Sequence, residues 1–258
     1  MADAQHIPPR LRLARLSLAP AIALGLIAVL WFAEARAQDI SINLGQGSGV
    51  TERVLQLIAL MTVLSVAPSI LIMVTSFVRI AVVLSLLRTA IGTQTAPPNS
   101  VIVGLSLFLT GFVMAPTFQA SYEAGVRPLL DNQIEMQQAF ERGAGPFREF
   151  MIKHVRERDL ALFQELSREP PPATPQEVSL RVLVPAFMIS ELRRAFEIGF
   201  LLFVPFLVID LVVASVLMSM GMMMLPPVVV SLPFKLIFFV LVDGWNLVAG
   251  SLVRSFGP

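Results

Sequence analysis

Four long apolar stretches constrain the fold of this 258-residue chain more than any other feature. They cover residues 54–91, 101–118, 198–217 and 228–253, with few charges in each. A stretch of about 20 apolar residues can cross a bilayer, and backbone inside hydrocarbon must satisfy its own hydrogen bonds, as a helix does. We therefore expect an all-α integral membrane protein made of helical hairpins, with four nominal transmembrane segments.

The composition supports a membrane protein and argues against several other classes. Apolar residues make up 55% of the chain and charged residues 14%, and the mean hydropathy is +0.76. The 19 Lys and Arg residues nearly balance the 18 Asp and Glu residues and are not gathered with aromatics, so we expect no nucleic-acid partner. The chain has no cysteine, which excludes disulfides and thiolate metal sites. We expect no metal ion and no cofactor.

The first 37 residues have the pattern of a signal peptide. A basic n-region precedes the apolar stretch Leu16–Phe32, and Ala35 and Ala37 are the small residues of a cleavage site. Cleavage after Ala37 makes Gln38 the first residue of the mature chain. An uncleaved signal anchor is the alternative, because the apolar stretch is long. Both interpretations deliver the chain to a bacterial inner membrane.

The composition of the residues that follow the signal peptide predicts four further segments. Residues 38–53 form a short polar segment, and residues 54–118 form a first hydrophobic helical hairpin that we expect to break at Pro68. Residues 119–181 alternate acids and bases, with apolar residues at helical spacing, and predict a helical periplasmic insertion. Residues 182–258 form a second hydrophobic helical hairpin with a methionine-rich loop.

Two details of the insertion carry specific expectations. The sequence Thr174-Pro175-Gln176-Glu177 has a capping-box pattern with proline at the first helical position, and it predicts the start of a helix. His154 is the only histidine after the predicted cleavage site. We expect it on a solvated helix face.

Charged residues inside the second hairpin require partners. A charge at membrane depth costs roughly 2.5–3.5 kcal/mol on insertion scales. Asp210 and Lys235 each lie about 12 residues from the middle of the methionine-rich loop, so antiparallel helices bring them to the same depth. We predict that they pair; the alternative is that each faces a neighbouring subunit. Asp243 is a third intramembrane charge that needs a structural or inter-subunit partner.

A second group of charges lies at the start of the same hairpin. Glu191, Arg193, Arg194 and Glu197 fall within a turn and a half. They can pair along their own helix, which contributes only tenths of a kcal/mol at an exposed position. The alternative is pairing between subunits, for example from Glu191 to Arg156 of the insertion.

The methionine-rich loop is the most unusual segment of the chain. Five methionines fall within seven positions, with a glycine among them and two prolines behind. Methionine is flexible and polarizable, so such a cluster forms a deformable apolar surface, although methionine also simply fills gaps in lipid-facing or core helices. The loop comprises Met218, Met220, Gly221, Met222, Met223, Met224, Pro226 and Pro227.

Several long motifs run through residues 54–256. They are Ser76–Ile80, Gln94–Asn99, Val184–Leu192, Gly199–Val212, the Met-Gly-Met-Met-Met-Leu run, Leu232–Leu236 and Val242–Trp245. These motifs resemble the FliP family of export-gate proteins, which has a flagellar branch and a branch in virulence injectisomes. The N-terminal signal segment favours the flagellar branch.

The resemblance implies a core subunit of the flagellar type III export gate. In that family the subunit forms a pentameric ring with FliQ and FliR around a membrane pore at the flagellar basal body, alongside other export-apparatus proteins. Unfolded rod, hook and filament subunits pass through that pore. The nominal spans of family members pack as hairpins lifted partly out of the bilayer plane. The methionine loop acts as a gasket in the pore, which carries over to Met222, Met223 and Met224, with Met218 and Met220 in support.

Two other classes of function remain as alternatives. A proton-coupled secondary transporter could use Asp210 and Asp243 as a proton relay, but the chain lacks an inverted repeat and has few spans. An intramembrane hydrolase needs a nucleophile and a base, and His154 is the only histidine of the mature chain. We therefore do not expect an enzyme.

Overall fold

The computed structural model describes residues 50–93, 95–170, 172, 174–222 and 224–257. The predicted signal peptide, its cleavage position at Ala37 and Gln38, and most of the polar segment 38–53 lie outside these residues. The regular elements of the described part are all helices, as the sequence predicts. The chain divides into two compact units, residues 1–60 and 61–258, and the packing and the sites described below belong to the second unit.

The first break in the apolar helices does not fall at the predicted proline. Helix α2 (Val50–Met73) continues through Pro68, and the break follows at residues 74–76, before α3 (Phe77–Ile91). Proline is tolerated inside membrane-type helices because other groups satisfy the freed backbone. The hydroxyl of Thr75 donates to the carbonyl oxygen of Ile72 at 3.2 Å and accepts from the N–H of Phe77 at 3.4 Å. These local bonds compete with the helix and locate the break.

The next helix extends further than the predicted hairpin. Helix α4 (Asn99–Ser121) continues without a break into the π-helical turn η2 (Tyr122–Val126) and then into α5 (Arg127–Leu130). The helix therefore passes the expected boundary at residue 118 and enters the polar segment.

Two helices and a short turn form most of the polar insertion. Helix α6 (Met136–His154) is followed by α7 (Glu157–Ser167) and the 3₁₀ turn η3 (Pro175–Glu177). The capping-box pattern at 174–177 gives only this turn, so the predicted helix start is wrong by a few residues.

The true helix start lies at Ser179. Its hydroxyl accepts from the N–H of Arg181 at 3.3 Å, and α8 (Leu180–Ser219) begins directly after it. The guanidinium of Arg148 donates to the carbonyl oxygens of Gln176 and Val178. Because these carbonyls are engaged from another helix, the chain stays non-helical until Ser179.

The second hairpin is made of α8, α9 (Pro227–Leu241) and α10 (Gly244–Arg254). Helix α8 has 40 residues and is about 60 Å long at 1.5 Å per residue, about twice the thickness of a bilayer's hydrocarbon core. Helices α9 and α10 meet at a 63° bend. The bend lies at Asp243, whose backbone is left-handed, with φ 50°.

Length and composition allow two to four membrane spans among the described helices. Two helices qualify by themselves, and two bent helix pairs qualify if each pair counts as one span. The single helices are Asn99–Leu130 and Leu180–Ser219, and the pairs are Leu57–Met73 with Phe77–Ile91 and Pro227–Leu241 with Gly244–Arg254. The prediction of a helical membrane protein agrees with this arrangement.

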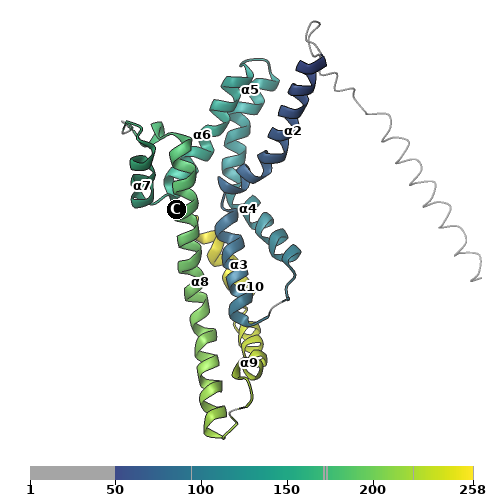
Figure 1. Cartoon of the computed structure of the whole chain (residues 1–258), viewed down its shortest axis with the longest axis vertical. Helices are drawn as coiled ribbons and strands as arrows, with labels where there is room; N and C mark the ends of the chain where they lie inside the picture. Colours follow the sequence, from purple (N-terminus) through teal and green to yellow (C-terminus); the bar gives the residue numbers. More distant parts are fainter. Residues whose placement is uncertain (1–49, 94, 171, 173, 223, 258) are drawn as a thin grey trace, which may run out of the picture. The chain divides into compact units, whose positions relative to one another are not determined.

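Two apolar cores hold the helices together. Helix α3 makes its most extensive contact with α8 and also packs against α4 and α9 (Figure 1). The larger core lies between these helices and α10, and the smaller one joins α6 to the start of α8. The central residues of the smaller core are Met151, Val182, Leu183 and Phe187. The polar insertion is therefore packed onto the first turns of α8.

A close approach between η2 and α6 gives a testable consequence. A Cβ atom on Gly125 would lie 2.5 Å from the carbonyl oxygen of Ala139 and 3.0 Å from the Cα of Gly143. We predict that Gly125→Ala lowers the free energy of unfolding by about 1–3 kcal/mol, because backbone must move to accept the methyl group. Thermal unfolding of the purified protein in detergent measures the change. Gly145→Ala is the matched control, since a Cβ atom at that position would meet no heavy atom within 4 Å outside the adjoining backbone of its own helix; equal effects of the two substitutions would contradict the prediction.

Candidate functional site: the methionine hairpin and its ion pairs

The methionine-rich loop forms the turn between α8 and α9. The N–H of Gly221 donates to the carbonyl oxygen of Met218 at 3.1 Å, and the N–H of Met222 donates to that of Leu217 at 3.0 Å. This pair of bonds, with φ 74° at Gly221, is a Schellman motif. Glycine is favoured there because most side chains are strained in the left-handed region. The sequence therefore places a sharp helix end in the middle of the methionines.

The proline pair begins the second arm of the hairpin. Pro226 is the N-cap of α9 and Pro227 its first residue, a position where the missing N–H of proline has no helical partner to lose. The loop between the two helix ends thus consists of residues 220–226.

The methionine side chains of this turn project away from the rest of the chain. The exposed fraction is 60% for Met218, 66% for Met220, 40% for Met222 and 97% for Met224. Met223 lies outside the described residues. An exposed cluster of thioethers argues against the alternative that these methionines fill gaps in a core of the same chain.

An ion pair between a buried lysine and a partly buried aspartate connects the two arms of the hairpin. The ammonium of Lys235 donates to the carboxylate of Asp210 at 2.7 Å, as the spacing of the two residues from the loop predicts. The hydroxyl of Ser231 donates to the other carboxylate oxygen at 2.5 Å. The Lys235 ammonium also reaches the carbonyl oxygen of Ala90, in the last turn of α3, at 3.3 Å. One lysine therefore joins α3, α8 and α9.

A second ion pair is completely buried at the other end of the α3–α8 contact. The guanidinium of Arg79 donates twice to the carboxylate of Glu191, at 2.8 and 2.5 Å, and the side chains are 1% and 0% exposed. The same guanidinium donates to the carbonyl and hydroxyl oxygens of Ser255, both at 3.1 Å. It also lies 3.7 Å from the ring centroid of Phe256. Arg79 thus ties the last residues of the chain to α3 and α8.

The proposed contact from Glu191 to Arg156 is wrong. Glu191 is fully enclosed with Arg79, and a carboxylate with no exposed surface cannot reach another subunit. The guanidinium of Arg156 instead donates to both carboxylate oxygens of Asp159, each at 2.8 Å. Both residues are therefore satisfied within one chain.

The remaining predicted charges occupy exposed or partly buried positions. Arg193 and Glu197 pair along α8 at 2.8 Å, with both side chains more than half exposed, so this pair contributes little to stability. Arg194 is partly buried and Asp243 is exposed. Within the described part of the chain, neither of the latter two residues forms an ion pair.

Asp159 anchors α7 to α8. The hydroxyl of Ser190 lies 2.6 Å from its carboxylate, and the backbone N–H of Arg156 donates to that hydroxyl at 3.0 Å. Burial by itself raises the pKa of Asp159, but hydrogen bonds from Ser190 and Arg156 outweigh burial and hold the pKa below its ordinary value. The ionised carboxylate is therefore part of the native packing.

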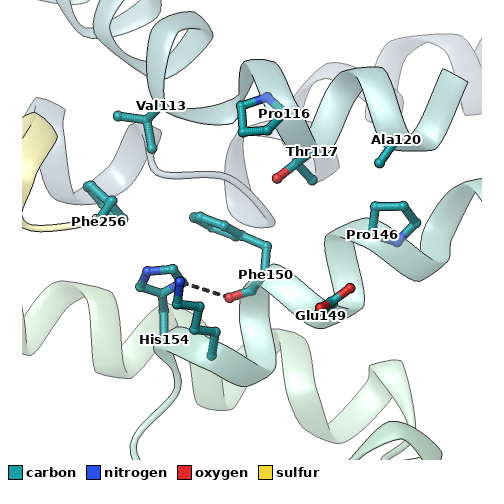
Figure 2. Close-up of a pocket in the computed structure, with 10 residues that line it drawn as sticks. Val113, Pro116, Thr117, Ala120, Pro146, Glu149, Phe150, His154 and Phe256 are labelled. Atoms are coloured by element: carbon teal, nitrogen blue, oxygen red, sulfur yellow. Dashed lines mark hydrogen bonds between the residues drawn. The ribbon is translucent and has the colours of Figure 1, made fainter. Parts of the chain in front are cut away.

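His154 does not lie on a solvated helix face, and that expectation is wrong. Its side chain is only 5% exposed. The ring packs 4.5 Å from Phe150 and 5.5 Å from Phe256, between centroids, and Nδ1 donates to the carbonyl oxygen of Phe150 at 2.8 Å (Figure 2). Burial lowers its pKa, and the nearby cations Arg79, Arg194 and Lys153 add to the effect. The ring is therefore neutral at neutral pH.

The sequence did not indicate the partners that come from distant parts of the chain. Arg79 carried one usable signal, because it is a charge in an apolar stretch that has no acid, and such a charge needs a partner from elsewhere. Nothing in the sequence identified Glu191 as that partner. Ser231 and Ser190 gave no signal at all, since an isolated serine in a helix is common.

The buried pair of Arg79 and Glu191 predicts strong coupling. Arg79→Met or Glu191→Met alone leaves an unpaired buried charge, which costs about 3–5 kcal/mol. The double variant replaces both charges by apolar groups, so we predict a loss well below the sum of the two single losses. Thermal or denaturant unfolding of the four proteins measures this coupling. Additive losses would contradict direct pairing.

The carboxylate of Asp159 predicts a pH dependence of stability. Its pKa is lowered on folding, so its contribution is complete above the unfolded pKa of about 3.9 and is lost as the pH falls through the lower, folded pKa. We predict that Asp159→Asn is less stable than the parent at neutral pH and that the difference shrinks below about pH 4. Unfolding midpoints across this range test the prediction. Asp131→Asn, at an exposed position, serves as the control. A stability difference between Asp159→Asn and the parent that stays constant at all pH values would contradict the prediction.

Comparison with known proteins places these features in a family. The FliP family matches residues 60–252, which include the pairs Arg79–Glu191 and Asp210–Lys235 and the methionine turn. The flagellar biosynthetic protein FliP of Caulobacter vibrioides is 70% identical over 225 residues, 87% of this chain and 85% of the relative. The proteins of the same name from Bacillus subtilis and Aquifex aeolicus are 55% and 48% identical, over 78% and 87% of this chain and 91% and 94% of their own. A family match over most of the chain, with relatives at these identities, shows that the chain belongs to the FliP family.

Proposed function

We propose that this chain is a core subunit of the flagellar type III protein export gate. In this proposal a ring of five copies, together with FliQ and FliR and other export-apparatus proteins, forms a pore in the bacterial inner membrane at the flagellar basal body. Unfolded rod, hook and filament subunits pass through the pore. The observation that carries the proposal is the exposed methionine turn, with Met224 97% exposed at the tip of an apolar hairpin.

The physical mechanism follows from the properties of thioether side chains. A closed ring of apolar, flexible side chains excludes water and ions by dewetting. An arriving unfolded chain displaces these side chains and contacts them without sequence preference, because methionine adapts its shape to many surfaces. The mechanism needs no covalent chemistry in this subunit.

The exposed apolar surface of α8 supports assembly with other chains. Helix α8 carries large apolar side chains that are well exposed in the single subunit, among them Phe196 at 58% and Phe200 at 68%. Lipid or protein must cover a surface of this kind. The helix is also about twice as long as a bilayer's hydrocarbon core is thick, so an upright α8 extends beyond the lipid.

The flagellar branch is supported by the names of the relatives. Each of the compared relatives is called a flagellar biosynthetic protein, and the predicted signal segment points the same way. A gate of a virulence injectisome remains the alternative outcome of the experiment. The contacts of Asp210 with Lys235 and Ser231 give that residue a structural role, which argues against the transporter alternative.

Substitution of the methionines tests the seal. We predict that replacing Met222, Met223 and Met224 by glycine leaves an assembled gate that leaks ions or a small dye, because the apolar constriction is lost. Leucine at the same positions keeps the apolar volume and should keep the seal. The exposed Met136→Gly, at the start of α6, controls for loss of a methionine elsewhere. Unchanged permeability in an assembled glycine variant would falsify the gasket role.

Secretion by living cells tests the export role. We predict that deleting the gene removes hook and filament proteins from the culture medium of the source bacterium, and that restoring the gene restores them. Flagellar secretion that continues after deletion, with loss of virulence effectors instead, would assign the chain to an injectisome.

A further inference from the structure

A cavity of about 290 Å³ lies between α4 and α6, beside the C-terminal Phe256 (Figure 2). It is separate from the methionine turn and has no part in the mechanism proposed above. Apolar side chains form one portion of its wall and four polar side chains the other. The polar group is Thr117, Glu149, Lys153 and His154, and the apolar group includes Val113, Pro116, Phe150 and Phe256.

The cavity lies where the apolar part of a candidate span ends. The apolar stretch of α4 runs from residue 101 to residue 118, and polar residues follow it. Phe108 and Phe112 are 81% and 72% exposed, and they precede Pro116 and Ala120 at four-residue spacing, so all four share one stripe of the helix. An exposed apolar stripe therefore leads directly to the cavity.

The two charges at the cavity are not used within the chain. Glu149 and Lys153 are four residues apart on α6, in the order that favours a helical ion pair. Both are exposed, and across the residues that the structure describes neither has an ion-pair partner. One negative and one positive charge thus remain available, about one helical turn apart.

His154 offers a hydrogen-bond acceptor at the same cavity. A carbonyl oxygen can only accept, so Nδ1 of the ring carries the proton that it donates to Phe150. In the neutral ring Nε2 is then an acceptor. This nitrogen has no hydrogen-bond partner among the described residues, although the side chain is 5% exposed.

We propose that this cavity binds the headgroup of phosphatidylethanolamine. Its phosphate contacts the Lys153 ammonium and the Thr117 hydroxyl, and its primary ammonium donates to Glu149 and to Nε2 of His154. Its acyl chains lie along the stripe of Phe108 and Phe112. Phosphatidylglycerol lacks a cation for Glu149, and the quaternary ammonium of phosphatidylcholine has no N–H to donate, so neither fits all of these groups. The inference does not rest on the export role.

Lipid titration of the full-length protein tests the headgroup. We expect native mass spectrometry in detergent to show about tenfold tighter binding of palmitoyl-oleoyl phosphatidylethanolamine than of the phosphatidylcholine or phosphatidylglycerol with the same chains, as one lost charge-assisted hydrogen bond implies. Soluble phosphoethanolamine should compete poorly, because it lacks the acyl contacts. Equal binding of the three lipids, or full displacement by phosphoethanolamine, would overturn the proposal.

Charge variants with matched controls locate the site. Lys153→Glu and Glu149→Gln should each weaken phosphatidylethanolamine binding about tenfold. Arg142→Glu and Glu141→Gln change the same kinds of charge on exposed positions of α6 outside the cavity, and they should leave binding unchanged. If the two cavity variants bind phosphatidylethanolamine as tightly as the two controls do, the lipid binds elsewhere and the proposal is overturned.

Discussion

The buried pair of Arg79 and Glu191 is the interaction on which the packing of α3 against α8 depends. Removing two charges from water costs several kcal/mol per ion unless geometry and further hydrogen bonds compensate. Here the guanidinium has a bidentate contact with the carboxylate, two oxygens of Ser255 and the face of Phe256. These contacts offset the cost of burying the two charges only when α3, α8 and the C-terminal residues are all in their native positions. The pair therefore makes three distant segments fold as one unit.

A similar device operates near the methionine turn. Lys235 joins Asp210 on α8 to the last turn of α3, so the two arms of the hairpin are held at the same depth. In the described residues of the turn beyond them, the hydrogen bonds include the Schellman pair and the bond from the N–H of Leu225 to the carbonyl oxygen of Met222, and two prolines follow. This combination gives a rigid base and an apolar tip that can deform. Such a tip suits a seal that must open for a passing chain and close after it.

The sequence predicted the features that depend on nearby residues. The methionine-rich loop between two apolar helices and the pair of Asp210 and Lys235 both follow from local spacing around one turn. The pair of Arg79 and Glu191 could not be predicted, because 112 residues separate its members and several arginines compete for the acid. His154 was misplaced for a related reason: its burial comes from Phe256, which is near only after folding.

Site-specific cross-linking tests the central claim, that the methionine turn lines the export path. The chain has no cysteine, so Met224→Cys introduces a single reactive thiol at the tip of the hairpin. An export substrate fused to a stably folded domain, with one cysteine in its unfolded part, would stall in the gate. The account predicts a cross-link between that cysteine and position 224, and none in Met136→Cys. A stalled substrate that cross-links at position 136 and not at position 224 would contradict it.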